Sequence, residues 1–131
     1  MKIHHVGIAV ESLESAVPVF SKLLGRSPNS QEVVADQQVR VAVFETGESR
    51  IELLEPTSPE STIARFLGKR GQGIHHVTLS VPDLSGKLQE LERAGFRLID
   101  REPRRGAGDE RIAFLHPSSA AGVLIELVEE K

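Results

Sequence analysis

Cysteine, tryptophan and tyrosine are absent from this chain of 131 residues, and aromatic residues make up only 4% of it. Without cysteine there can be no disulfide, no thiolate ligand and no cysteine nucleophile, so a metal site must use nitrogen and oxygen donors. Without tryptophan and tyrosine, few side chains can stack on a planar drug, which disfavours a drug-binding module.

Excess positive charge and long apolar runs are also missing. The net charge of -3 gives no basic field for a polyanion, so we expect no nucleic-acid partner. No apolar run approaches the roughly 20 residues that cross a bilayer, so we expect no membrane partner either. Residues 1–5 enter a strand pattern at once, which predicts no signal peptide and a cytoplasmic location. The length and the 39% hydrophobic share predict one soluble globular domain.

The chain repeats itself. Residues 5–10 (HVGIAV) read like residues 76–81 (HVTLSV) at an offset of 71, and residues 51–55 (IELLE) read like residues 125–129 (IELVE) at an offset of 74. Chance can produce one such match between short apolar strands. Two matches in the same order at nearly the same offset indicate a duplicated structural unit.

Each half is predicted to run from a strand through a helix into a hairpin. The first half has strands at 2–10, 39–46 and 50–55 and a helix that begins after Ser12 and ends at Gly25, with a kink expected at Pro18. The second half has strands at 74–81, 111–116 and 122–129 and a helix from Asp83 to Gly95. A short linking helix around residues 63–67 separates them. The predicted divisions are repeat 1 (1–58), the linking helix (59–72) and repeat 2 (73–131).

Four possible metal ligands occupy matching places in the two halves. If an approximate twofold relates the halves, His5 matches His76 and Glu52 matches Glu126, so two imidazoles and one or two carboxylates can converge on one ion. Such a mixed nitrogen and oxygen set suits divalent Co, Ni, Zn, Fe or Mn. An imidazole must be neutral to bind a metal, so affinity should weaken below a pH of about 6.5.

The same residues also allow interpretations without a metal site. His4 and His75 share the offset of His5 and His76, and spacing alone does not choose between the two pairs; adjacent strand residues face opposite sides, so only one pair can point inward. Glu52 and Glu126 could face solvent, whereas an inward ionised carboxylate would need a partner. Three arginines at 101, 104 and 105 form a basic cluster that is either solvated or meets a phosphorylated ligand.

Four segments together resemble the methylmalonyl-CoA epimerases, a family of the vicinal oxygen chelate (glyoxalase) superfamily. They are residues 5–10, 60–67 (ESTIARFL), 73–77 (GIHHV) and 122–129 (GVLIELVE). The resemblance spans essentially the whole chain. It implies an α+β fold, a single vicinal oxygen chelate domain over residues 1–131, in which paired βαβββ modules form one curved mixed sheet around a metal site.

The resemblance also implies an activity and a ligand set. It implies an isomerase of propionate metabolism that interconverts the (R) and (S) forms of methylmalonyl-CoA by proton transfer through a chelated enolate. The implied cofactor is one divalent metal ion, most often cobalt, with Ni, Zn, Mn or Fe as alternatives, and the implied ligands are His5, Glu52, His76 and Glu126. The implied partners are an acyl-CoA substrate and a second copy of the chain in a homodimer.

The chain departs from some family members at two points. In those members a glutamate in the strand equivalent to residues 39–41 acts as the catalytic base, whereas position 41 here is valine. They also carry glutamine where this chain has Glu52. We therefore hypothesise that Glu126 and Glu52 are the two proton-transfer groups, with Asp36 in reserve. The family's lysine after His-Pro is replaced by Ser118, which puts a ligand contact at that position in doubt.

Three other functions compete on this fold. A glyoxalase-like lyase or isomerase would use nearly the same metal set. An extradiol dioxygenase would leave Glu52 without a role, because its iron site needs only two histidines and one carboxylate. A metal-free module that binds small molecules is the rival from a different class.

Overall fold

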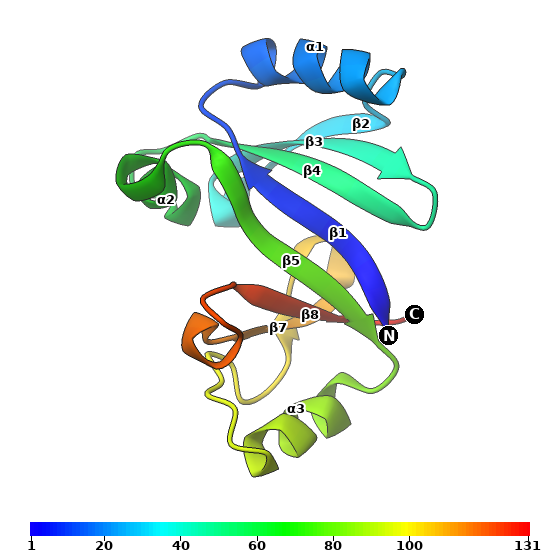
Figure 1. Cartoon of the computed structure of the whole chain (residues 1–131), viewed down its shortest axis with the longest axis vertical. Helices are drawn as coiled ribbons and strands as arrows, with labels where there is room; N and C mark the ends of the chain where they lie inside the picture. Colours follow the sequence, from blue (N-terminus) through cyan, green and yellow to red (C-terminus); the bar gives the residue numbers. More distant parts are fainter. The chain divides into compact units, whose positions relative to one another are not determined.

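The computed structural model describes residues 1–131, except for the side chain of Ala107. It divides into two compact units: the first unit is His5–His75, and the second unit is His76–Lys131 together with Met1–His4. Figure 1 labels β1, α1, β2, β3 and β4 of the first series and β5, α3, β7 and β8 of the second. The boundaries of repeats and linker given above stay a prediction.

The elements follow the predicted order, with one additional strand in each half. In the first half they are β1 (Lys2–Ala9), α1 (Leu13–Leu24), β2 (Ser30–Val34), the short 3-10 helix η1 (Ala35–Gln37), β3 (Val39–Thr46) and β4 (Ser49–Pro56), followed by α2 (Thr62–Arg70). In the second half they are β5 (Gly73–Val81), α3 (Leu84–Arg93), β6 (Arg104–Arg105), η2 (Ala107–Asp109), β7 (Arg111–Leu115), η3 (Pro117–Ser119) and β8 (Ile125–Glu129). The additional strands are β2 and β6, which complete the βαβββ series.

The helices begin where capping chemistry predicts. The side chains of Ser12, Ser61 and Asp83 each accept a hydrogen bond from a backbone N–H in the first turn of α1, α2 and α3. α1 ends at Gly25, whose φ of 70° is a left-handed conformation that glycine adopts without strain. Pro18 lies inside α1, but the helix continues to Leu24 because its apolar face packs on the sheet.

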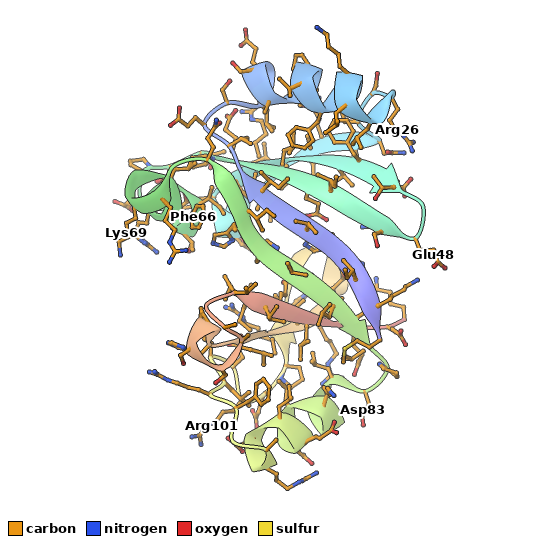
Figure 2. All side chains as sticks on the ribbon, in the orientation of Figure 1. Arg26, Glu48, Phe66, Lys69, Asp83 and Arg101 are labelled. Atoms are coloured by element: carbon orange, nitrogen blue, oxygen red, sulfur yellow. The ribbon has the colours of Figure 1, made fainter. Side chains whose placement is uncertain are left out.

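In the first unit the strands lie in the order β2-β3-β4-β1, with β1 parallel to β4 and the other pairs antiparallel. Helix α1 packs against one face, over Ala42, Phe44 and Leu53 (Figure 1). Helix α2, on which Figure 2 labels Phe66, packs against a second cluster that includes Val39, Val41 and Leu54. Because side chains alternate along a strand, these two clusters lie on opposite faces.

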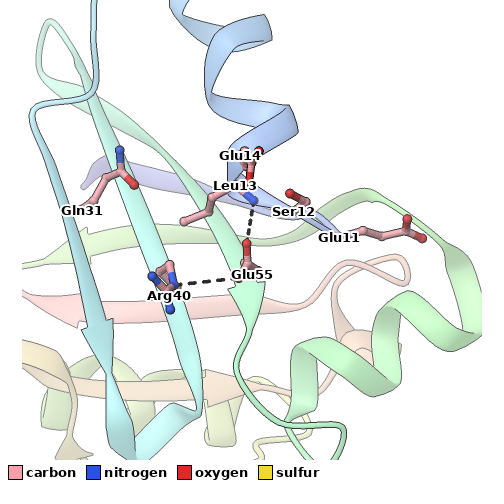
Figure 3. A pocket seen from close by; sticks show the side chains of 7 residues that line it. All are labelled: Glu11, Ser12, Leu13, Glu14, Gln31, Arg40 and Glu55. Carbon is pink, nitrogen blue, oxygen red and sulfur yellow. Dashed lines mark hydrogen bonds and ion pairs between the residues drawn. The ribbon is translucent and has the colours of Figure 1, made fainter.

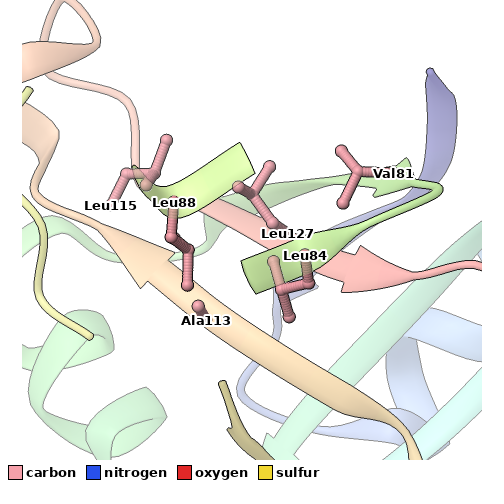
Figure 4. Close-up of a cluster of buried hydrophobic side chains, with 6 residues drawn as sticks. All are labelled: Val81, Leu84, Leu88, Ala113, Leu115 and Leu127. Carbon is pink, nitrogen blue, oxygen red and sulfur yellow. The ribbon is translucent and has the colours of Figure 1, made fainter. Parts of the chain in front are cut away.

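In the second unit the strands lie in the order β5-β8-β7-β6, with β5 parallel to β8. Helix α3 packs on one face of this sheet, over the cluster drawn in Figure 4: Val81, Leu84, Leu88, Ala113, Leu115 and Leu127. Strand parity places His76, Thr78 and Glu126 on the other face. Each unit therefore carries a histidine and a glutamate on one face of its sheet. In the first unit this is the face on which α2 packs, because Glu52 has the same strand parity as Leu54.

Candidate functional site

In the first unit, His5 on β1 and Glu52 on β4 lie beside each other. The register pairs Gly7 with Glu52, and the distance from His5 Nδ1 to Glu52 Oε2 is 3.6 Å. Both side chains are mostly buried, with 11% and 17% of their surfaces exposed. A separation of 3.6 Å exceeds an ordinary N–H···O hydrogen bond. It is close to the roughly 3.0–3.5 Å that separates two donors on one ion at metal–donor distances of about 2.1 Å.

The second unit repeats this arrangement with His76 on β5 and Glu126 on β8. His76 Nε2 lies 3.6 Å from Glu126 Oε1, the same distance as in the first unit. The register pairs Thr78 with Glu126, and the Thr78 hydroxyl donates a hydrogen bond of 2.6 Å to Glu126 Oε1. The two halves thus carry equivalent His–Glu pairs at equivalent register positions, as the sequence repeat predicts.

The pKa of Glu126 is shifted by its surroundings. Burial raises the pKa of its carboxyl above the ordinary value, and the carboxylate of Glu110 adds to the rise, while the Thr78 hydroxyl and the Arg104 guanidinium oppose it. A buried carboxylate with a raised pKa is a stronger base than an exposed one and gains more from a nearby cation. Both properties suit a metal ligand or a proton acceptor.

The neighbouring histidines have other surroundings. His4 Nε2 lies 4.0 Å from Glu110 Oε2 near the surface. His75 packs edge-on against Phe66 of α2, with ring centroids 5.0 Å apart, and burial lowers its pKa. Strand parity places His4 and His75 on the faces of β1 and β5 opposite to those of His5 and His76.

Two further residues lie near Glu126, and the sequence did not predict their position there. Phe114 is the partner of Glu126 across β7 and β8, and its ring lies edge-on to His76 with centroids 6.5 Å apart. Arg104 lies over the same ring at 5.1 Å and also pairs with Asp100 at 3.3 Å. Arg104 thus belongs to the surroundings of Glu126, whereas Arg101 pairs with Glu92. Only the strand register, which the sequence does not display, brings these side chains together.

The reserve residue Asp36 does not lie beside Glu52. It is exposed in η1, before the start of β3 at Val39, whereas Glu52 pairs with Val43. Val39 and Val43 are four residues apart, which corresponds to roughly 13 Å along β3, and Asp36 lies before Val39. Ser118 is on η3, where its backbone N–H donates to Nδ1 of His116, so this segment is a local capping turn.

An open depression of about 490 Å³ lies beside the start of α1 in the first unit (Figure 3). Its lining residues hold the first turn of this helix. There Glu55 accepts a hydrogen bond of 2.7 Å from the backbone N–H of Leu13 and lies 3.8 Å from Arg40. The second unit has the same arrangement: Glu129 accepts from the N–H of Leu84 at 3.0 Å and from Arg111 at 3.0 Å. Because the contact recurs at the start of both helices, we interpret it as structural.

Comparison with known proteins agrees with this geometry. Residues 4–114 match the model of the Glyoxalase/Bleomycin resistance protein/Dioxygenase superfamily, and the chain belongs to that superfamily. The predicted fold class, α+β with paired βαβββ modules of the glyoxalase type, is confirmed. None of the described helices is long and apolar enough to cross a membrane.

Several relatives are named as epimerases. The chain is 36% identical to the ethylmalonyl-CoA/methylmalonyl-CoA epimerase of Cereibacter sphaeroides over 128 residues, 96% of each protein. It is 42% identical to the uncharacterised protein YqjC of Bacillus subtilis over 99% of this chain and 93% of that protein. A Streptomyces coelicolor methylmalonyl-CoA epimerase in complex with 2-nitronate-propionyl-CoA superposes with a TM-score of 0.90 at 35% identity, covering 99% of this chain and 94% of the other. The predicted resemblance to methylmalonyl-CoA epimerases is confirmed.

Proposed function

We propose that this chain is a metal-dependent epimerase that interconverts the two epimers of methylmalonyl-CoA. The observation that carries the proposal is the recurrence of a buried His–Glu pair, at 3.6 Å in both halves, in a chain whose relatives include epimerases of this substrate. The bound acyl-CoA analogue of the Streptomyces enzyme supports an acyl-CoA substrate.

We further propose that the two pairs bind one divalent ion together. In this proposal His5, His76 and Glu126 are the main ligands. Glu52, whose Oε2 lies 3.6 Å from His5 Nδ1, is the fourth. Neutral imidazole nitrogens and carboxylate oxygens are suitable donors for Co²⁺, Ni²⁺, Zn²⁺, Mn²⁺ or Fe²⁺. The ion would supply Lewis-acid stabilisation of the negative charge that develops on the substrate oxygens. Cobalt, the homodimer and the cytoplasmic location remain predictions.

The carboxylates carry out the proton transfer in this proposal. The reacting carbon lies between a thioester carbonyl and a carboxylate, so its proton is acidic, and epimerisation requires its removal on one face and its return on the other. Glu126 serves one face. Its burial makes it a stronger base than an exposed carboxylate. Glu52, in the matching place of the other half, serves the opposite face. Asp36, some strand residues away, is not needed.

Solvent exchange tests the proposal directly. One methylmalonyl-CoA epimer is incubated in deuterated water with protein loaded with Co²⁺ and with protein treated with a chelator. We expect deuterium at the central carbon and formation of the other epimer, both abolished by chelation and restored by added metal. Unchanged substrate after remetallation with several divalent ions would overturn the assignment. Turnover of a glutathione hemithioacetal instead would favour the glyoxalase-like alternative.

A further inference from the structure

Thr78 contacts Glu126, although it is neither a metal ligand nor a proton-transfer group in the proposed function. Its side chain is fully buried, and its hydroxyl donates a 2.6 Å hydrogen bond to Glu126 Oε1. That length is typical of a strong O–H···O⁻ bond to an ionised acceptor. The same oxygen lies 3.6 Å from His76 Nε2, so the hydroxyl holds the carboxylate at the atom that faces the histidine.

The first half shows that the fold does not demand this hydroxyl. Gly7 is paired with Glu52 at the register position where Thr78 is paired with Glu126. Glycine has no side chain, so no hydroxyl can reach Glu52 from that position of β1. Both halves thus carry the His–Glu pair, and only the second half carries a hydroxyl at this register position.

We infer that Thr78 is a positioning residue that orients the Glu126 carboxylate beside His76 and thereby prepares it to bind the metal ion. This inference rests on the proposed function. A glutamate side chain has several rotatable bonds, and binding an ion requires one arrangement of them. The Thr78 hydroxyl selects one of these arrangements through its hydrogen bond to the carboxylate. Groups that orient a metal ligand in this way typically contribute tenfold to hundredfold in affinity or activity.

The two carboxylates become inequivalent as a result. Glu126 is held by a neighbouring hydroxyl and its side chain is 10% exposed, whereas the Glu52 side chain is 17% exposed and pairs with glycine. The Thr78 hydroxyl therefore fixes the position of the Glu126 carboxylate, whereas the glycine at the matching position offers no hydroxyl to Glu52.

The test compares Thr78→Val, which has the same shape without the hydroxyl, with Thr78→Ser, which keeps the hydroxyl. The readouts are Co²⁺ affinity and the visible absorption of bound Co²⁺, which reports ligand geometry. We expect Thr78→Val to weaken Co²⁺ binding by roughly 10- to 100-fold and to change the spectrum, and Thr78→Ser to restore both. Thr78→Ala, which introduces no bulk, has the same expectation as valine and replaces it if the valine variant does not fold.

Ser80 provides the matched control. It is a buried hydroxyl two residues along β5 that donates to the backbone carbonyl of Lys2 at 3.4 Å, so Ser80→Ala should leave Co²⁺ affinity and spectrum unchanged. Wild-type Co²⁺ affinity and spectrum in the folded Thr78→Val protein would overturn the inference while leaving the proposed function intact. If the unsubstituted protein binds no ion or gives no solvent exchange, the proposed function itself fails.

Discussion

Glu126→Gln is expected to lower kcat for epimerisation by about 10²- to 10⁴-fold, the range that one general acid or base contributes. The amide keeps the shape and can still accept a hydrogen bond from Thr78, but it cannot take a proton and is a poorer ligand for a divalent ion. Turnover is measured with saturating Co²⁺. Glu130→Gln, at an exposed residue just after β8, is the control and should keep full activity.

The same substitution should not weaken the metal-free protein. Burial raises the pKa of Glu126 in the folded state, so the stability that this group contributes is present below its unfolded pKa and is lost as the pH rises through the folded pKa. Glutamine carries no charge at any pH. In the presence of a chelator, the Glu126→Gln variant should therefore be at least as stable to thermal unfolding as the unsubstituted protein at pH 7. At pH 4 the variant should no longer be the more stable of the two. A large loss of stability at pH 7 would show that the carboxylate serves the fold.

Glu52→Gln separates the two proton-transfer roles. If Glu126 and Glu52 act on opposite faces, this variant should still exchange the proton of one epimer with deuterium but convert little of it to the other epimer. Full epimerisation by the variant would remove Glu52 from the mechanism and leave the second acid to be found elsewhere.

His76→Asn is expected to weaken Co²⁺ binding by more than about 100-fold, because loss of a ligand should exceed the 10- to 100-fold typical of losing an outer partner. His4→Asn is the matched control, since strand parity places His4 on the face of β1 opposite to His5. Both variants are titrated with Co²⁺ by absorption at pH 7. Equal affinities in the two variants would mean that the parity argument selected the wrong histidines.

The sequence alone predicted the duplicated strand–helix–hairpin series and the positions of the matching residues. This succeeded because the signals are local: alternation along β1 and β5, caps at Ser12 and Asp83, and two motifs repeated in order. The structure gives Glu52 and Glu126 equivalent partners in register, at Gly7 and Thr78. The similar offsets of the two repeated motifs therefore correspond to equivalent register positions in the two halves.

Features that depend on pairing between strands were missed. β6 has two residues, which are too few to show any periodicity. In β2 the first four side chains are all exposed, so buried and exposed residues do not alternate along it. Thr78 and Phe114 become neighbours of Glu126 only through the register of β5, β7 and β8. Glu55 and Glu129, which looked like ordinary strand residues, anchor the first turns of α1 and α3 from a distance in sequence.

Counting the bound ions tests most directly whether each half gives one histidine and one carboxylate to a shared site. Titration of the metal-free protein with Co²⁺ should saturate at one ion per chain, and His5→Asn should weaken that single site as strongly as His76→Asn does. Two ions per chain, with one retained after either substitution, would show that each His–Glu pair binds alone and would contradict the account.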